Sequence, residues 1–156
     1  MMVSTVRGHF GQMSGTAQYD PAAPEQAKVV AEVDVRSIDT RNGKRDDHLR
    51  SPDFFDAEKF PTMRFESTKI ERSGGGLKMT GNLTLRGVTR EVVFDVEGPV
   101  APVQARGGWR TGATATATIS RKDFGMTWNR AIEAGGVTVG DEVTIVIDVA
   151  LTRPGE

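Results

Sequence analysis

The residues of this chain that are best suited to chemistry stand together as Asp46-Asp47-His48. An aspartate beside a histidine can form a general base, and carboxylates with an imidazole can bind a divalent cation. No nucleophile elbow, phosphate-binding loop or metalloprotease helix motif accompanies the cluster. Its acids also lack the glycine and glutamate spacing of a calcium-binding loop. We therefore favour a structural role over catalysis, in which the acids cap a helix and Arg45 and His48 tie loop backbone in place.

The composition excludes several classes of function. The chain has 156 residues, with 20 basic and 21 acidic side chains and a net charge of −1. It therefore lacks the electrostatic footprint of a protein that binds nucleic acid or an anionic membrane. It contains no cysteine, which excludes disulfides and thiolate catalysis. Because His9 and His48 are its two histidines, we expect no metal site.

The length and the ends of the chain predict a single domain and a location. We expect one domain over residues 1–152 and a frayed tail at 153–156, since a chain of this size hides ~70% of its surface on folding. No apolar run approaches the ~18 residues of a membrane span, so no membrane insertion is expected. The start, MMVSTVRGHF, has no signal-peptide core. As written, the chain predicts a cytoplasmic protein, whereas a true start upstream of Met1 would allow a periplasmic or secreted one.

Apolar and polar residues alternate along most of the chain, which is the pattern of strands with one buried face. Clusters of glycine and proline separate the alternating segments. About seven or eight long antiparallel strands in one domain predict an all-β barrel or sandwich, and their length suits the tilted staves of a barrel. We expect strands over Val6–Tyr19, Lys28–Ile38, Thr62–Ile70, Gly76–Arg86, Glu91–Glu97, Val100–Arg106, Trp109–Ser120 and Glu142–Leu151.

The charged and aromatic stretch 41–65 interrupts the strands. Lys44 to Arg50 predicts about two helical turns. Ser51 is a suitable N-cap for a further helix, with Pro52 at its first position. We therefore expect a short helical excursion near 43–56, after which the chain re-enters the sheet. The phenylalanines of this excursion would cover one end of the barrel: Phe54, Phe55 and Phe60.

The apolar face of the strand expected at 109–120 carries Ala113, Ala115 and Ala117 in succession. Alanine is a poor strand former, and small inward side chains leave volume inside a barrel. Natural cores are densely packed, so either large residues or a ligand must fill that volume, and the pattern alone favours neither. The large residues that could fill it are Trp109, Phe65, Met79 and Phe94.

A second apolar group comes after that strand. Phe124, Met126 and Trp128 alternate with small or polar residues. Aromatic and thioether groups adapt well to apolar ligands at the mouth of a cavity. The same residues could equally form a plug that closes the end of a barrel.

Several motifs stand in order along the chain, within a stretch from about Val6 to Leu151. They are Ser37-Ile38-Asp39-Thr40, Arg45-Asp46, His48-Leu49, Ser51, Asp53-Phe54-Phe55-Asp56, Lys59-Phe60-Pro61, Phe65, Gly81–Thr89, Ser120–Gly125 and Val139–Val143. Together these motifs resemble the signature of the YceI family. The resemblance implies a lipocalin-like antiparallel barrel that holds a polyisoprenoid chain or similar amphiphile in an internal tunnel. It also implies common dimerisation, no catalytic constellation and no cofactor other than the bound lipid.

The start of the chain departs from that family. Members usually begin with a strand of the type Trp/Tyr-x-Ile-Asp-x-x-His-Ser, and an apolar run then leads into a second histidine. Residues 1–8 here resemble the segment immediately after that histidine. Without the first strand, the barrel is expected to have a gap and an unpaired edge. We expect a true start upstream of Met1, the alternatives being a neighbouring chain or a shifted strand in the gap.

We therefore expect a non-enzymatic protein that binds a polyisoprenoid or isoprenoid quinone-like lipid inside the barrel for carriage or storage. The resemblance to the family also implies a homodimer. One alternative is an enzyme that modifies a lipid or small molecule with Asp46, Asp47 or His48. Another is a stress-linked interaction module without a ligand. Strand parity and aromatic placement give the candidate ligand-binding residues Phe10, Val33, Phe65, Leu77, Met79, Leu83, Trp109, Ala113, Ala115, Phe124, Met126 and Trp128.

Overall fold

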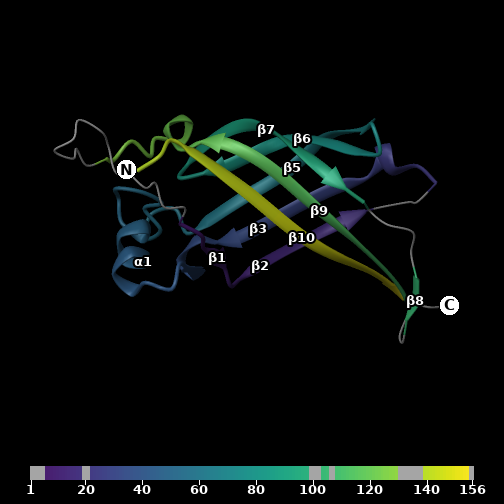
Figure 1. The fold of residues 1–156 in the computed structure, drawn as a ribbon, viewed down its shortest axis with the longest axis horizontal. Helices are drawn as coiled ribbons and strands as arrows, with labels where there is room; N and C mark the ends of the chain where they lie inside the picture. The colour runs from purple at the N-terminus through teal and green to yellow at the C-terminus, as the bar shows by residue number, and fades with distance from the viewer. Residues whose placement is uncertain (1–5, 19–21, 99–102, 106–107, 130–138, 155–156) are drawn as a thin grey trace.

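A computed structural model describes residues 6–18, 22–98, 103–105, 108–129 and 139–154. An eight-stranded antiparallel sheet has the strand order β10-β9-β7-β6-β5-β3-β2, with β8 paired to β9 (Figure 1). Within the described ranges, no helix is long and apolar enough to cross a membrane. The strands of this sheet are β2 (Met13–Gln18), β3 (Lys28–Asp34), β5 (Thr62–Ser73), β6 (Gly76–Leu85), β7 (Val88–Glu97), β8 (Val103–Ala105), β9 (Gly108–Ser120) and β10 (Glu142–Pro154).

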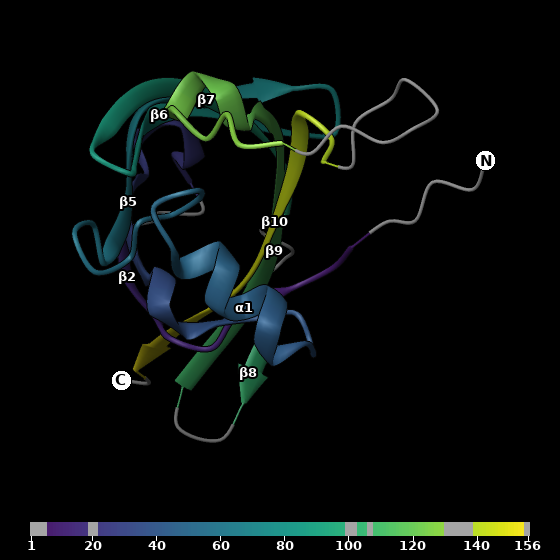
Figure 2. The same ribbon diagram turned by 90° about the vertical axis from the view of Figure 1, so that its left-hand side faces the viewer.

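Smaller elements complete the fold. A two-stranded ladder pairs β1 (His9–Phe10) with β4 (Ile38–Asp39). One α-helix, α1 (Gly43–Arg50), lies across one end of the curled sheet (Figure 2). The expected all-β antiparallel architecture with one short helix is confirmed. The remaining elements are the 3-10 turns η1 (Pro24–Gln26), η2 (Val35–Ser37) and η3 (Arg121–Phe124).

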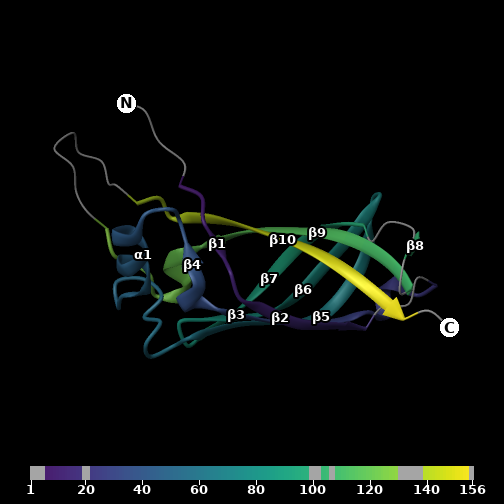
Figure 3. The same cartoon turned by 90° about the horizontal axis from the view of Figure 1, so that it is seen from below.

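The sheet curls around a concave face, and its two margins are β2 and β10. Figure 3 views the molecule from the side on which both margins lie. In the part of the chain that the structure describes, β2 pairs only with β3 and β10 pairs only with β9. The sheet is therefore a curled half-barrel with two free edges rather than a closed ring of strands.

Large side chains fill the concave face over β5, β6 and β7. Phe65 stands opposite Leu83 in the ladder, and Met79 stands opposite Phe94. All four side chains are buried, and the rings of Phe65 and Phe94 meet edge to face with centroids 5.0 Å apart. Gly81 leaves room for this packing, because a Cβ there would collide with the Phe65 ring and the Glu66 carbonyl. We call this region the packed wall.

Two expected strands are shorter than the alternation predicts. The chain leaves the extended conformation between β1 and β2, where Gly11 and Gln12 donate backbone hydrogen bonds to Ser37. The strand expected to reach Ile38 ends at Asp34. The Asp34 carboxylate accepts from the Arg36 amide at 3.0 Å, and its carbonyl accepts from the Ser37 hydroxyl at 2.5 Å. These side-chain bonds compete with the strand ladder and turn the chain into η2.

The helical excursion is also shorter than expected. Asn42 caps α1, because its side chain accepts from the Arg45 amide at 3.0 Å. Ser51 closes α1 instead of starting a second helix, since its hydroxyl donates to the His48 carbonyl at 2.5 Å. Hydrogen-bonded turns come next, with amides of residues 54–57 donating to carbonyls of residues 49–51. These turns bury Phe54 under the helix and leave Phe55 and Phe60 half-buried.

Candidate functional site

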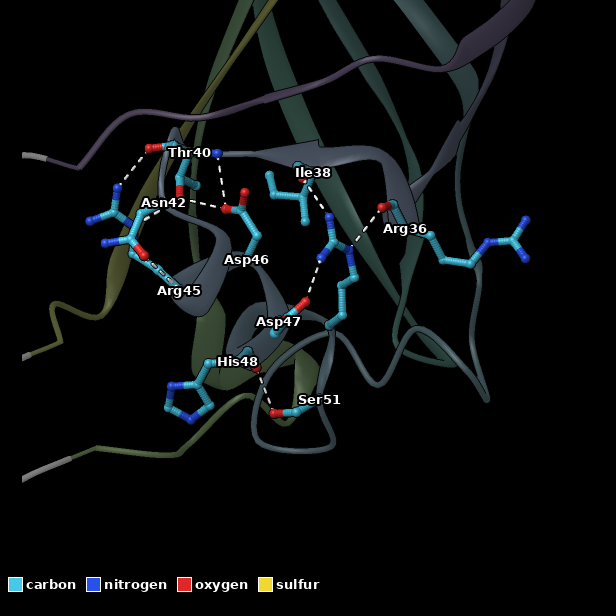
Figure 4. Close-up of polar contacts among 10 residues, drawn as sticks. Arg36, Ile38, Thr40, Asn42, Arg45, Asp46, Asp47, His48 and Ser51 are labelled. Carbon is cyan, nitrogen blue, oxygen red and sulfur yellow. Dashed lines mark hydrogen bonds and ion pairs between the residues drawn. The ribbon is translucent and has the colours of Figure 1, made fainter.

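The acidic residues of the Asp46-Asp47-His48 cluster serve the fold. Asp46 is 7% exposed and accepts from the Thr40 amide at 3.0 Å and from the Thr40 hydroxyl at 2.5 Å (Figure 4). The hydroxyl bond lowers the pKa of the Asp46 carboxyl from its ordinary value, since it favours the charged form. Asp47 is exposed and pairs with Arg50 at 3.0 Å. Both acids therefore secure the helix.

Two arginines complete this attachment of α1. Arg45 donates to the hydroxyl and the carbonyl of Thr40, both at 2.8 Å. Arg50 donates to the carbonyls of Arg36 at 2.9 Å and Ile38 at 3.1 Å. Figure 4 shows these bonds joining the helix to β4 and η2. The guanidinium groups of Arg45 and Arg50 thus bind the helix to backbone carbonyls of the neighbouring segment.

His48 lies on another side of the helix from the acids beside it. Its Nε2 is 2.9 Å from the Asp53 carboxylate. Its ring meets Trp128 edge to face at 4.5 Å and Phe54 at 5.0 Å. The three neighbours in sequence therefore do not converge on one point. No group of three potential metal ligands occurs among the described residues.

The segment after β9 packs as a plug at the same end of the sheet. Phe124 is 1% exposed and Met126 is 5% exposed. The buried Arg121 holds this segment, donating to the carbonyls of Gly140 at 2.8 Å, Met126 at 2.7 Å and Trp128 at 2.8 Å. A buried guanidinium needs such partners for its donors. Of the two roles considered for this aromatic group, the packing favours the plug.

The three alanines on one face of β9 differ in burial. Protein side chains therefore cover part of this face and leave part of it open. Ala115 and Ala117 are 4% and 5% exposed and belong to the buried cluster that includes Phe94. Protein side chains therefore fill the space over this part of the strand. Ala113, one step further along the same face, is only half-buried.

A second group of apolar side chains lies on the same concave face but near the margins of the sheet. The ladders fix their direction, because Ala31 stands opposite the buried Phe65 while Ile145 and Ile147 stand opposite the buried Ala117 and Ala115. Unlike the packed wall, this group is half-buried throughout. We call it the open flank, and it consists of Val29, Ala31 and Val33 on β3, Ala113 on β9, and Ile145 and Ile147 on β10.

Some of the candidate ligand-binding residues are buried and others are half-buried. The buried ones are Phe65, Met79, Leu83, Ala115, Phe124 and Met126. The half-buried ones are Phe10, Val33, Leu77, Ala113 and Trp128. The side chain of Trp109 lies outside the described residues. The candidates omitted Val29, Ala31, Ile145 and Ile147, although the alternation of β3 and β10 places them on the apolar face.

Two depressions open to solvent beside the margin strands. One of about 520 Å³ adjoins β10, and one of about 500 Å³ adjoins β2. Their linings mix polar, charged and small side chains, so neither is a cavity for an apolar ligand. The first is lined by Glu97, Gly98, Gly112, Ala113, Thr114, Asp148 and Ala150, and the second by Gly11, Gln12, Met13, Ser14, Glu32, Val33, Asp34 and Thr62.

With this geometry established, comparison with known proteins identifies the family. The model of the YceI-like domain matches residues 1–151. This chain belongs to the YceI family. A UPF0312 protein of Staphylococcus aureus is 37% identical over 144 residues, covering 92% of this chain and 82% of the relative. A UPF0312 protein of Vibrio cholerae is 40% identical over 124 residues, covering 79% of this chain. The match spans 66% of that relative's length.

Solved structures of other proteins share the fold. The Campylobacter jejuni YceI protein superposes with a TM-score of 0.85 at 31% identity, covering 98% of this chain and 88% of its own. Burkholderia cenocepacia BcnA gives a TM-score of 0.77 at 27% identity, covering 93% and 87%. A polyisoprenoid binding domain from Saccharophagus degradans gives 0.61 at 14% identity, covering 94% and 85%, which shows a similar fold.

Proposed function

We propose that this YceI protein binds an apolar amphiphile of the polyisoprenoid or isoprenoid quinone class along the open flank, for carriage or storage. The observation that carries the proposal is the half-buried state of inward apolar side chains on β3, β9 and β10. Apolar surface left on a concave face is a feature of sites that receive apolar partners. The polyisoprenoid binding domain of Saccharophagus degradans shares the fold and supports the choice of ligand class.

The chemistry of the open flank suits a long and narrow hydrocarbon. Ala31 and Ala113 carry small side chains, whereas the packed wall on the same concave face carries Phe65 and Phe94. A hydrocarbon ligand lying along these small residues would contact the apolar surface of the packed wall on one side. Each buried CH₂ contributes about 0.8 kcal/mol, so a few isoprene units suffice for binding without a charged anchor.

The position of the open flank also suits a ligand with a polar head. The flank lies beside the free edges of β2 and β10, and Met13 of β2 is 52% exposed. A head group could therefore stay in water while the chain lies on the concave face. Such an arrangement avoids the cost of burying an unpaired polar group.

A fluorescence titration with decylubiquinone, an isoprenoid-quinone analogue, tests this proposal. Quinone binding near either tryptophan is expected to quench emission saturably. Ala113→Phe would fill the open flank and is expected to weaken binding at least about tenfold. This is a larger loss of affinity than the removal of one buried CH₂ group would cause. Ala150→Phe is the matched control, since Ala150 is exposed on the neighbouring strand.

The outcome separates a binding protein from an interaction module. Saturable quenching that Ala113→Phe removes and Ala150→Phe preserves supports a ligand on the open flank. No saturable quenching, or equal binding by both folded variants, contradicts it. Circular dichroism of each variant checks that the sheet has formed.

A further inference from the structure

β7 and β9 share a far shorter ladder than the other long neighbouring strands of the sheet. β6 pairs with β7 over residues 77–85 and 88–96, and β9 pairs with β10 over the whole length of both strands. In the described ladders, β7 pairs with β9 only over residues 95–97 and 114–116. We call this short ladder the seam. It joins the ribbon formed by β9 and β10 to the rest of the sheet.

On the side of the seam nearer to α1, the ribbon is anchored (Figure 1). β9 does not pair with β7 there in the described ladders, but Ala117 is buried in the hydrophobic core. Arg86, in the turn between β6 and β7, donates to the Gly125 carbonyl at 3.0 Å. Arg90 of β7 donates to the Asp123 carbonyl at 3.1 Å. Packing and hydrogen bonds therefore hold this part of the ribbon in place.

Beyond the seam, the ribbon continues past the end of β7 (Figure 1). Gly112 and Ala113 lie between the seam and the ladder of β8 with β9, and in the described ladders they pair with β10 alone. A depression of about 520 Å³ opens to solvent beside Gly112. Ala113 is half-buried, whereas Ala115 at the seam is buried. We call this part of the ribbon, residues 108–113 and 149–154, the flap.

Gly112 gives β9 a point at which it can bend. Glycine adopts backbone conformations that other residues avoid, and inside a strand it weakens the ladder. Gly112 stands opposite Ala150 of β10, so neither strand carries a large side chain at this place. The rest of this face of β9 carries stiff β-branched side chains that favour the extended conformation, namely Thr114, Thr116 and Thr118. The residue with the most backbone freedom thus lies immediately beyond the seam.

We propose that the flap, together with the paired β8, swings about Gly112 and closes over a ligand on the open flank. The proposal rests on the proposed function, because Ala113 belongs both to the flap and to the open flank. In the open position, a hydrocarbon chain can enter along the concave face. In the closed position, Ala113 would contact that chain. A ligand that makes this contact only in the closed position shifts the flap towards it.

Amide hydrogen exchange of the full chain, followed by mass spectrometry, tests the motion. Amides of the flap should exchange at least about tenfold faster than those of the anchored residues 115–120 and 142–147, because local opening costs less where fewer side chains are packed. Saturating decylubiquinone should slow exchange in the flap and leave exchange in β6 unchanged. Equal exchange in the flap and the anchored part, or flap exchange that bound quinone does not slow, would overturn the proposal.

Gly112→Val tests the hinge, because it adds a stiff side chain on the face of β9 opposite to that of Ala113. Flap exchange should slow, and stopped-flow fluorescence should show quinone association slowed at least about threefold. Gly112→Ala should act in the same direction with a smaller effect. Thr118→Val is the matched control, since Thr118 is exposed on the same face in the anchored part of β9. It should leave both rates unchanged.

The outcomes distinguish the hinge from the proposed function. Folded Gly112→Val and Gly112→Ala variants that take up the quinone at the original rate would overturn a hinge at Gly112. Quinone binding by a chain whose flap exchanges as slowly as the anchored part would overturn the flap and leave the proposed function standing. Fast flap exchange that Gly112→Val slows, without quinone binding, would support the hinge and contradict the proposed function.

Discussion

The packed wall and the open flank lie on the same concave face but differ in what covers them. On the packed wall, Phe65 and Phe94 are 4% and 1% exposed. On the open flank, Ala31 and Ile147 are half-buried although the ladders point them the same way. The packed wall lies on the central strands β5, β6 and β7, whereas the open flank lies on the margin strand β10 and on β3 and β9 next to the margins. Equal periodicity in the sequence thus leads to unequal burial.

From this contrast we expect the packed wall to contribute most to stability, and we propose the open flank as the place where a ligand binds. Buried aromatic and aliphatic groups contribute most of the hydrophobic stabilisation of a domain. Half-buried groups contribute less and leave apolar surface for a partner. Substitutions in the packed wall should therefore lower the free energy of unfolding more than substitutions in the open flank.

The largest effect is expected at Phe94. Phe94→Ala should lower the free energy of unfolding by about 3 to 5 kcal/mol, because it leaves a cavity beside Phe65. Ile147→Ala on the open flank should cost less than about 2 kcal/mol, since its side chain is already partly in water. Denaturant unfolding followed by circular dichroism measures both. Equal losses at the two positions would remove the distinction between the regions.

The next effect is expected at Arg121, which holds the plug beside the packed wall. Arg121→Met should lower the free energy of unfolding by about 3 kcal/mol, because the buried Met126 carbonyl and the Gly140 carbonyl lose their donor. Arg121→Lys should recover part of the loss, since an ammonium donates but does not reproduce the planar fork. A Met variant as stable as the original would show that the plug does not depend on this side chain.

A smaller, pH-dependent effect is expected at Asp46. Its pKa is lowered in the fold by the Thr40 hydroxyl, so its stabilisation is present above the ordinary aspartate pKa of about 3.9. That stabilisation is lost as the pH falls through the lowered pKa of the folded state. Asp46→Asn should therefore lose less stability on acidification than the original chain.

The exposed Asp47 provides the matched control for this measurement, carried out as denaturant unfolding from about pH 6 to about pH 3. Asp47→Asn should keep the acid sensitivity of the original chain, because Asp47 pairs only at the surface with Arg50. Identical acid profiles for the two variants would contradict the role given to the bond between Thr40 and Asp46.

Local patterns in the sequence predicted the strands and the helix because each depends on near neighbours. Alternation predicted β6 and β9 close to their observed bounds, and the run from Lys44 to Arg50 predicted most of α1. Ser51 was misassigned because the same hydroxyl can cap the start of one helix or bond the last carbonyl of another. The early end of β3 was not predicted because it depends on hydrogen bonds that Asp34 accepts from the Arg36 amide and the Ser37 hydroxyl.

The candidate site was less predictable because burial depends on which strands become neighbours. Parity correctly placed Met79 and Ala113 on the apolar face, but it does not show that Met79 is buried and Ala113 half-buried, since Ala115 on the same face of β9 is buried. Ile145 and Ile147 carried the same alternation signal and were left out of the candidates. The dispersal of Asp46 and His48 to different partners likewise results from the path of the chain around α1.

Native mass spectrometry after incubation with decylubiquinone tests the central claim most directly. If the open flank binds an apolar amphiphile, the original chain should retain the quinone as a discrete adduct. Ala113→Phe should lose that adduct while Phe94→Leu, a change within the packed wall, should keep it. A mass spectrum of the original protein without the quinone adduct would contradict binding on the open flank. So would an Ala113→Phe variant that retains the quinone as well as the original protein does.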